Sequence, residues 1–240
     1  MKDILYDLKI SCNRCNLGDI CMPRGLSKEG VNTLSGVVKQ KSILHQDELI
    51  YRQGDDFKGI FAIQAGMVKL VTDDLTGDEH ILSILLPGEL LGFDGLNDKH
   101  SCSAIALNTV SCCELPKVRI DELCSQVPNL TRELFRHSSD ILNESQARVI
   151  STKLSGEKKM AVFLLDLSNR LKQRGFSESE FRLPLTRNEI GNHLGLAIET
   201  VSRLLKQLQQ KKVVTIQQKQ VQILDIAELR RIAAHDKSLH

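Results

Sequence analysis

The 240-residue sequence contains no apolar run of about 18 residues, which is the length that a membrane-spanning helix requires. It also lacks an apolar stretch near its start, where Lys2, Asp7 and Lys9 lie among the first ten residues. We therefore expect neither a membrane span nor a secretory signal. The expectation is a cytoplasmic protein, long enough for one large domain or two ordinary ones.

Sequence motifs of enzymes are missing as well. The chain has no glycine-rich nucleotide-binding loop and no nucleophile and base at a recognisable spacing, and it has no second set of three or four closely spaced cysteines besides the one described below. These absences count against a redox enzyme or an electron carrier, which is the alternative class for a chain with clustered cysteines. We expect a protein without catalytic activity.

Cysteine, in contrast, is clustered. The sequence has seven cysteines, and three of them, Cys12, Cys15 and Cys21, follow the spacing C-x2-C-x5-C. In a reducing compartment, clustered cysteines more often bind metal or perform redox chemistry than form a disulfide framework. The nearby Pro23 and Gly25 predict a loop, which can wrap three sulfur atoms around one ion or cluster. A disulfide and unrelated surface thiols are the alternative interpretations.

The net charge of +2 is unevenly distributed along the chain. Residues 1–155 contain 17 Lys and Arg against 21 Asp and Glu, so their net charge is −4. Residues 156–240 contain 15 against 9, so their net charge is +6. A basic C-terminal third favours a polyanionic partner on that side, and a solvated basic surface is the alternative.

The first half of the chain changes from helical to strand-like patterning. Ser27 to Gln40 reads as a short helix capped by Ser27. From Ile43 to Leu115, short apolar segments are separated by glycines eleven or twelve residues apart, with hairpins near Gly66 and Gly77. This spacing predicts an antiparallel sandwich or barrel.

A long helix is predicted next. After a short helix at residues 119–126, Pro128 occupies the first turn of a helix that runs to about Leu154. Phe135, Leu142 and Val149 recur every seven residues, with Ser138 and Ser145 between them, at positions where a strong coiled coil has leucine. Each serine forgoes roughly 1.5 to 3 kcal/mol of apolar burial, so we expect a marginal, switchable dimer interface. Packing of this helix on its own domain is the alternative.

The C-terminal third reads as a winged helix-turn-helix. Residues 157–174 form an amphipathic helix, and Thr186 with Glu189 forms a capping box ahead of a helix that ends at Gly195. A second helix begins at Ala197 or Ile198, and residues 213–224 alternate as a small hairpin, or wing. The exposed side of the second helix carries three base-reading candidates, Glu199, Ser202 and Arg203. Four lysines are expected to contact phosphates: Lys206, Lys211, Lys212 and Lys219.

The order of these parts resembles the CRP/FNR family of bacterial transcription regulators. The stretch LTRNEIGNHLGLAIETVSRLL, Leu185 to Leu205, carries the resemblance, and the cysteine spacing with LLPGELLGFDG, Leu85 to Gly95, narrows it to the oxygen-responsive FNR branch. The fold implied is α+β: an antiparallel β-roll or sandwich sensor domain, a long dimerisation helix and a C-terminal winged helix-turn-helix. The segments implied are a cysteine-rich loop (1–26), the sensor domain (27–127), the long helix (128–155) and the DNA-binding domain (156–240).

The resemblance also implies a cofactor. FNR-type proteins hold a 4Fe-4S cluster on four cysteines, which here correspond to Cys12, Cys15, Cys21 and Cys113. Cys112 is adjacent to Cys113, but neighbouring strand residues point to opposite faces, so only one of them faces the loop. Zinc also accepts four thiolates, although three ligands in one loop and a fourth about 90 residues later fit a cluster better. Cys102 and Cys124 are expected to be packing residues.

Ligand and DNA specificity follow from the same resemblance. Cyclic-nucleotide regulators hold the phosphate with an Arg-Ser pair, and Cys102 and Ser103 stand at those positions, so we expect no cyclic nucleotide. The implied operator is a palindrome of TTGAT half-sites on double-stranded DNA, read by the three base-reading candidates with support from Thr186 and Arg187. Oxygen would convert the cluster, weaken the homodimer and so switch activation or repression of aerobic and anaerobic genes.

Two further surfaces are implied. Other family members have an acidic residue at the position of Glu144, as this chain does, but an apolar residue where this chain has Arg148. The dimer interface therefore runs either through Phe135, Leu142 and Val149 or one residue earlier, through Ile141 and Arg148. A surface for RNA polymerase is implied on an acidic turn, made of Asp73, Asp74, Thr76, Gly77, Asp78 and Glu79.

Overall fold

The computed structural model describes residues 12–40, 43–74 and 76–234. The described chain forms two compact units, one comprising residues up to 73 together with 84–142, the other 74–83 together with residues from 143 onward. Residues 1–11 of the predicted cysteine-rich segment lie outside the described residues. Within the described ranges, no helix has the length and apolar character needed to cross a membrane.

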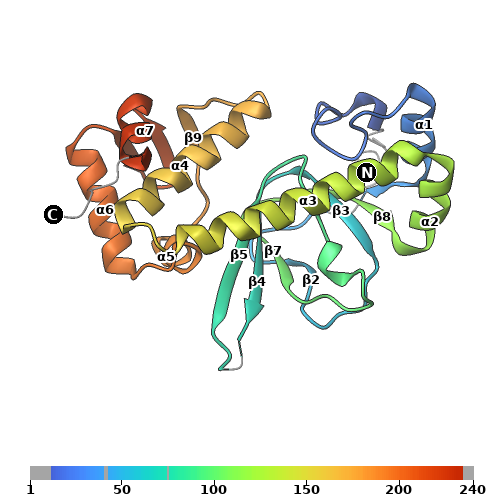
Figure 1. The fold of residues 1–240 in the computed structure, drawn as a ribbon, viewed down its shortest axis with the longest axis horizontal. Helices are drawn as coiled ribbons and strands as arrows, with labels where there is room; N and C mark the ends of the chain where they lie inside the picture. The colour runs from blue at the N-terminus through green and yellow to red at the C-terminus, as the bar shows by residue number, and fades with distance from the viewer. Residues whose placement is uncertain (1–11, 41–42, 75, 235–240) are drawn as a thin grey trace, which may run out of the picture. The chain divides into compact units, whose positions relative to one another are not determined.

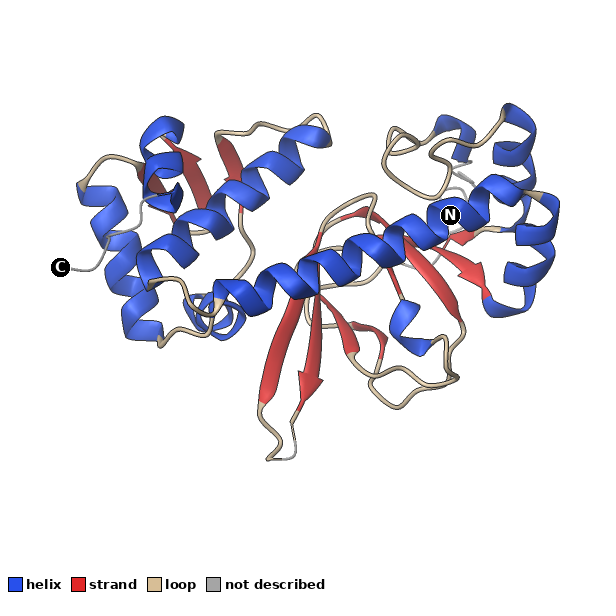
Figure 2. Ribbon diagram, in the orientation of Figure 1, coloured by secondary structure: helices blue, strands red, loops and turns tan. Residues whose placement is uncertain are grey.

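Two antiparallel four-stranded sheets build the predicted β-roll (Figures 1 and 2). The first has the order β1-β8-β3-β6, and the second has the order β2-β7-β4-β5. The strands of the first sheet are β1 (Lys39–Gln40), β8 (Ser111–Pro116), β3 (Gly59–Ala65) and β6 (Leu90–Leu91). Those of the second are β2 (Leu49–Tyr51), β7 (Ser103–Ala106), β4 (Val68–Asp73) and β5 (Glu79–Leu85).

The middle of the first sheet is buried on both faces, because the side chains of β3 alternate between two cores. On β3, Phe61 and Ile63 belong to the core that contains residues of both sheets. Ile60 and Ala62 belong to a second core, shared with the helices that cover the sheet. In the register between β3 and β8, Ala62 pairs with Cys113 and Ile63 with Cys112.

Three helices contribute to the second core: α1 (Lys28–Val37), α2 (Lys117–Gln126) and α3 (Pro128–Ser151). The Ser27 hydroxyl caps α1 as predicted and accepts a hydrogen bond from the Gly30 amide at 3.1 Å. The helix ends at Val37, earlier than predicted, because Lys39 and Gln40 pair with β8 instead. The long helix begins at Pro128 as predicted and ends three residues before Leu154.

The second unit is a helical domain with a three-stranded sheet. Its helices are α4 (Gly156–Gln173), α5 (Arg187–Leu194), α6 (Ile198–Gln210) and α7 (Ile226–Ala234). Its sheet has the order β10-β11-β9, made of β10 (Val214–Gln217), β11 (Gln220–Ile223) and β9 (Glu180–Arg182). The apolar face of α4 is buried as its pattern predicts, and the two-stranded wing gains β9 as a third strand. The fold class is the predicted α+β.

Candidate metal centre and DNA-reading helix

The N-terminal cysteines lie in a loop of consecutive tight turns, as their flanking residues predict. A 3-10 turn, η1 (Cys12–Arg14), begins it, and the Cys15 amide donates to the Cys12 carbonyl at 3.3 Å. The Gly18 amide donates to the Cys15 carbonyl at 3.2 Å, and the Arg24 amide donates to the Cys21 carbonyl at 3.0 Å. Ser35 of α1 anchors the start of the loop, because its hydroxyl accepts from the Cys12 amide at 3.2 Å.

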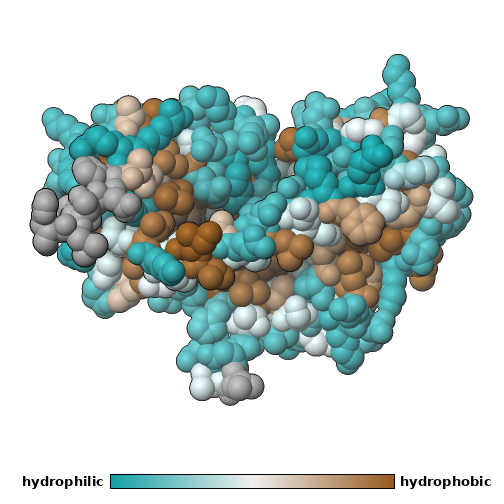
Figure 3. All heavy atoms as spheres, in the orientation of Figure 1, coloured by the Kyte–Doolittle hydropathy of each residue, from teal (hydrophilic) through white to brown (hydrophobic). Residues whose placement is uncertain are grey.

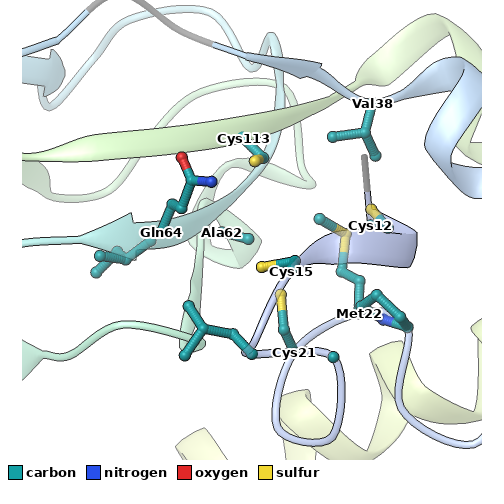
Figure 4. Close-up of a pocket in the computed structure, with 12 residues that line it drawn as sticks. Cys12, Cys15, Cys21, Met22, Val38, Ala62, Gln64 and Cys113 are labelled. Carbon is teal, nitrogen blue, oxygen red and sulfur yellow. The ribbon is translucent and has the colours of Figure 1, made fainter. Parts of the chain in front are cut away.

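Four cysteines from two distant segments line one pocket that is open to solvent (Figure 4). Cys12, Cys15 and Cys21 come from the loop, and Cys113 comes from β8. Apart from Gln64, the rest of the lining carries no polar side-chain group; it consists of Leu17, Gly18, Met22, Pro23, Val38, Ala62 and Ile63. Among the described residues, no three metal-ligating side chains are grouped as they would be around a single ion. The four thiols line the same pocket without forming a close group of ligands among the described residues.

Burial and mutual repulsion raise the pKa of these thiols. Burial, followed by smaller contributions that include neighbouring cysteines, raises the pKa of Cys21 to about 12. The pKa of Cys113 rises to about 12 because of burial and then because of Cys12, Cys15 and Cys112. Burial and Cys15 also raise the pKa of Cys12. Thiols that oppose one another's ionisation fit a cationic group, since metal binding stabilises the thiolate forms together.

The other three cysteines lie away from the metal-binding geometry. Cys112 is completely buried in the core between the two sheets, so it faces away from Cys113, as strand alternation predicts. Cys124 is half-buried against the helix-covered core, and Cys102 is 3% exposed. We therefore interpret these three cysteines as packing residues rather than as ligands.

Cys102 also belongs to a buried polar network that the sequence did not suggest. The Asp94 carboxylate accepts hydrogen bonds from the Tyr51 hydroxyl at 3.1 Å, the Ser101 amide at 3.0 Å and the Cys102 thiol at 3.4 Å. The His100 ring lies 3.2 Å from the same carboxylate and stacks on Tyr51, with 3.7 Å between ring centroids. Next to it, the Ser103 hydroxyl accepts from the Gln53 amide at 2.9 Å. At the two positions where cyclic-nucleotide regulators have an Arg-Ser pair, Cys102 and Ser103 therefore bond to Asp94 and Gln53 of the chain itself.

The cysteine loop continues directly into the core that holds α3. Met22, which follows Cys21, is 1% exposed and lies in the same core as Leu130 and Leu134 of α3. The Asn129 side-chain amide also donates to the Gly25 carbonyl at 3.4 Å. Loop and helix thus share both apolar packing and a hydrogen bond.

The predicted dimer face of α3 is exposed. Phe135, Leu142 and Val149 are 72%, 64% and 70% exposed, and Figure 3 shows apolar side chains at the surface along the line of this helix. Ser138 turns back to its own helix, where its hydroxyl donates to the Leu134 carbonyl at 3.1 Å. Ile141 is 40% exposed, whereas Arg148 is half-buried and burial lowers its pKa. Glu144 and Ser145 are exposed on the same helix.

The helix-turn-helix is formed by α5 and α6. The Thr186 hydroxyl accepts from the Glu189 amide at 3.1 Å, and the Thr186 amide donates to the Glu189 carboxylate at 2.8 Å, which completes the predicted capping box. Gly195 adopts a φ of 64° at the bend, in the left-handed region that favours glycine. Val201 and Leu204 are buried and hold α6 in place.

The opposite side of α6 presents the three base-reading candidates. Glu199 and Arg203 are exposed and Ser202 is half-buried. The exposed Arg187 guanidinium donates to the Ser202 hydroxyl at 3.2 Å, so it bridges the two helices. The exposed Ile198, in the first turn of α6, was not singled out from the sequence, although an apolar side chain there suits a thymine methyl group.

Three of the four predicted phosphate-binding lysines, Lys206, Lys211 and Lys212, are exposed, and Lys219 is half-buried. Lys211 forms an ion pair with Glu157 at 2.7 Å, and the Lys219 ammonium donates to the Pro184 carbonyl at 2.9 Å. Two of the four lysines thus have internal partners that sequence reasoning had not assigned.

The acidic turn predicted to meet RNA polymerase lies between β4 and β5. The Asp74 carboxylate organises it by accepting from the Thr76 hydroxyl at 2.6 Å and from the Asp78 amide at 3.1 Å. The His80 ring lies 2.9 Å from the same carboxylate. These hydrogen bonds hold the pKa of Asp74 well below its usual range. The other members, Asp73, Gly77 and Glu79, lie on the same turn or its flanking strands.

Comparisons with known proteins agree with this architecture. Residues 42–127 match the family model described as the cyclic nucleotide-binding domain, and residues 158–232 match the Crp-like helix-turn-helix domain. The chain is 41% identical over 224 residues to the transcriptional activator protein anr of Pseudomonas aeruginosa, covering 92% of each protein. It is 35% identical over 230 residues to the fumarate and nitrate reduction regulatory protein of Vibrio cholerae, covering 95% of this chain and 92% of that one.

A solved structure extends the agreement to the fold. The structure of FixK2 from Bradyrhizobium japonicum matches with a TM-score of 0.76 at 22% identity, covering 83% of this chain and 99% of FixK2. The family is one of transcription regulators without enzymatic activity, and its helix-turn-helix domain binds DNA. The chain belongs to the CRP/FNR family of transcription regulators, in its FNR branch.

Proposed function

We propose that this chain is an oxygen-responsive transcription regulator that holds a 4Fe-4S cluster on Cys12, Cys15, Cys21 and Cys113. The observation that carries the proposal is the meeting of these four thiols, from segments about 90 residues apart, around one pocket. We assign residues 1–26 to the cluster loop, 27–127 to the sensor domain, 128–155 to the dimerisation helix and 156–240 to the DNA-binding domain.

The choice of a cluster rests on size and ligand chemistry. A zinc ion requires four sulfur atoms about 2.3 Å from a single point, whereas a four-iron cluster fills a larger volume between its thiolates. An open pocket ringed by four sulfur atoms suits the larger group. When bound, the cluster supplies reactivity towards oxygen. The four cysteines would hold the cluster, and the apolar lining residues would shield it from solvent. The cysteine loop would transmit loss of the cluster to α3.

Transmission to α3 follows from the shared core. Release of the cysteines would free the loop around Met22, which packs with Leu130 and Leu134. It would also free the Gly25 carbonyl from Asn129. The first turns of α3 would lose that support, and this helix carries the proposed dimer interface.

We place the dimer interface on Phe135, Leu142 and Val149. Their exposure leaves apolar surface for a second copy of the chain, flanked by Ser138, Ile141 and Ser145. Arg148 is half-buried beside Asp166 and Arg170 of α4, which favours this register over the one through Arg148. Glu144 is exposed, and two copies in a dimer would repel each other there, so pairing stays marginal and switchable.

The proposed operator is a palindrome of TTGAT half-sites on double-stranded DNA. Arg203 can donate two hydrogen bonds to guanine and Glu199 can accept from a cytosine amino group. Ser202 lies between them, held by Arg187, while Thr186 caps the supporting helix. The acidic turn around Asp74 is the proposed contact for RNA polymerase. No cyclic nucleotide is proposed, because Asp94 puts a carboxylate where an anionic phosphate would need a cation.

Anaerobic purification tests the proposal directly. We expect a brown protein with about four iron per chain, a dimer by sedimentation, and tight binding to a TTGAT palindrome that is lost after exposure to air. Arg203→Ala should weaken that binding by roughly 1 to 3 kcal/mol, with little change on an unrelated sequence. A colourless anaerobic protein that holds one zinc ion would overturn the cluster, and equal losses on both DNA sequences would overturn base reading by Arg203.

A further inference from the structure

Gln64 is the polar member of the cysteine pocket. It lies on β3, two residues beyond Ala62, which pairs with Cys113 in the register of the sheet. Gln64 and Cys113 both line the pocket that the cysteine loop covers. Among the described lining residues, Gln64 has the only side chain with N–H groups.

The neighbouring strand fixes the orientation of the Gln64 amide. The Ser111 hydroxyl of β8 donates to the Gln64 side-chain oxygen at 3.3 Å. Because the oxygen is engaged there, the NH₂ group turns to the other side of the carboxamide. In Figure 4 the nitrogen lies on the side of the pocket where the sulfur atom of Cys113 is found. Among the described residues, this NH₂ group has no hydrogen-bond acceptor.

The backbone supports this placement. The register between β3 and β8 shifts between Ile63 and Ala65, which places Gln64 in an irregular position of the ladder. Such irregularities re-aim a side chain and recur near functional sites. Gln64 is half-buried, whereas the next residue, Ala65, is exposed, so its amide lies at the edge of the pocket rather than in free solvent.

We infer that Gln64 is a positioning residue that donates a hydrogen bond to sulfur in the cluster site and tunes how easily the bound cluster gives up an electron. This inference rests on the proposed function. Four thiolates carry more negative charge than a four-iron core compensates, so an N–H donor beside them stabilises the more reduced state. Reaction with air removes one electron from the cluster and passes it to dioxygen, which becomes superoxide. The Gln64 donor opposes that transfer.

Gln64→Met tests the inference, because it removes both N–H groups at nearly constant volume. The full-length variant is loaded with iron and sulfide under anaerobic conditions. We expect the midpoint potential for one-electron oxidation of its cluster to be more negative than in the wild type. We also expect loss of the visible absorbance in air to be about tenfold faster. Gln64→Glu should shift both further, since it places a negative charge beside the thiolates. Ser111→Ala, which only frees the amide, should give a smaller shift in the same direction.

Gln126→Met is the matched control, because it makes the same substitution at an exposed position of α2 away from the pocket, where the Gln126 amide donates to Glu122. It should leave both measurements unchanged. Equal potentials and equal air sensitivity in wild type, Gln64→Met and Ser111→Ala, all with full iron, would overturn the inference alone. A wild-type protein that binds no iron would overturn the proposed function and this inference with it.

Discussion

Two sites in the β-roll unit contain cysteine, and they are built in opposite ways. In the interior, the Cys102 thiol, the Tyr51 hydroxyl and the His100 ring all meet the Asp94 carboxylate. At the pocket, Cys21 and Cys113 have mainly other thiols and apolar side chains for neighbours. In the first site the chain's own atoms satisfy the polar groups, whereas the second is the site that we propose for a bound cluster.

The contrast shows that the pKa of a cysteine does not reveal its role. The pKa of Cys102 and that of Cys113 both rise to about 12. For Cys102 the causes are burial and then the adjacent Asp94 carboxylate, to which the thiol donates a hydrogen bond. For Cys113 the causes are burial and then other thiols, which a single shared cationic group relieves at once. The neighbours, rather than the size of the shift, distinguish a ligand from a packing residue.

The largest expected effect comes from removing one pocket thiol. Cys113→Ser should reduce the iron content of anaerobically purified protein from about four per chain to a trace, because the cluster loses its ligand from the sheet. Cys124→Ser changes a half-buried thiol on α2 and serves as the matched control, which should retain full iron. Iron and sulfide analysis with the visible spectrum provides the measurement. Equal iron in both variants would make the two kinds of cysteine indistinguishable.

Breaking the interior site should cost stability instead of iron. Asp94→Ala leaves several buried donors without an acceptor, so the free energy of unfolding should fall by about 3 kcal/mol. Asp140→Ala removes an exposed carboxylate that pairs with Arg136 on α3, and its cost should stay below about 1 kcal/mol. Urea unfolding of the metal-free protein, followed by circular dichroism, compares them. Similar losses in both variants would contradict the interior network.

A smaller effect is expected from pH. The folded pKa of Cys102 lies above its value of 9.0 in the unfolded chain, so its contribution to stability is complete below pH 9 and is lost as pH rises towards 12. Above pH 9 the stability of the metal-free protein should therefore fall, by up to about 1.4 kcal/mol per pH unit for each such thiol. Urea midpoints between about pH 8 and about pH 10, with reductant, measure this slope.

The same measurement separates the two sites. Cys102→Ser should make the slope shallower in metal-free and cluster-loaded protein alike. Loading the cluster should remove the part that comes from Cys21 and Cys113, since bound thiolates no longer titrate. A loaded protein as sensitive to pH as the metal-free form would show that the pocket thiols are not ligands.

Sequence reasoning succeeded where a local rule determines the structure. Pro128 begins α3, Ser27 and Thr186 cap their helices, and strand alternation turns Cys112 away from Cys113. Each of these follows from residues a few positions apart. Local patterns also predicted an antiparallel sandwich or barrel, a long helix and a winged helix-turn-helix, and the family resemblance identified their order as one α+β architecture.

The features that were missed depend on residues far apart in the chain. The Asp94 network joins a tyrosine on β2 to a carboxylate 43 residues later, and no sequence period marks such a pair. Lys211 pairs with Glu157 across 54 residues, a contact that no local pattern indicates. Gln64 reaches the pocket because the register shifts near Ala65. Long-range pairing and register become visible only in the folded chain.

Met22 lies beside Cys21 and is buried with Leu130 and Leu134, so its burial limits the free energy that this one contact can transmit from the loop to α3. Burial of a methionine side chain contributes roughly 1.5 to 3 kcal/mol. A complete switch of a two-state equilibrium, from about 1:99 to about 99:1, requires about 5.5 kcal/mol. Through this side chain alone, release of the loop can change the equilibrium constant between the two states of α3 by roughly 10- to 150-fold. In the proposed mechanism, loss of the Met22 contact alone would therefore shift the equilibrium of α3 only partly.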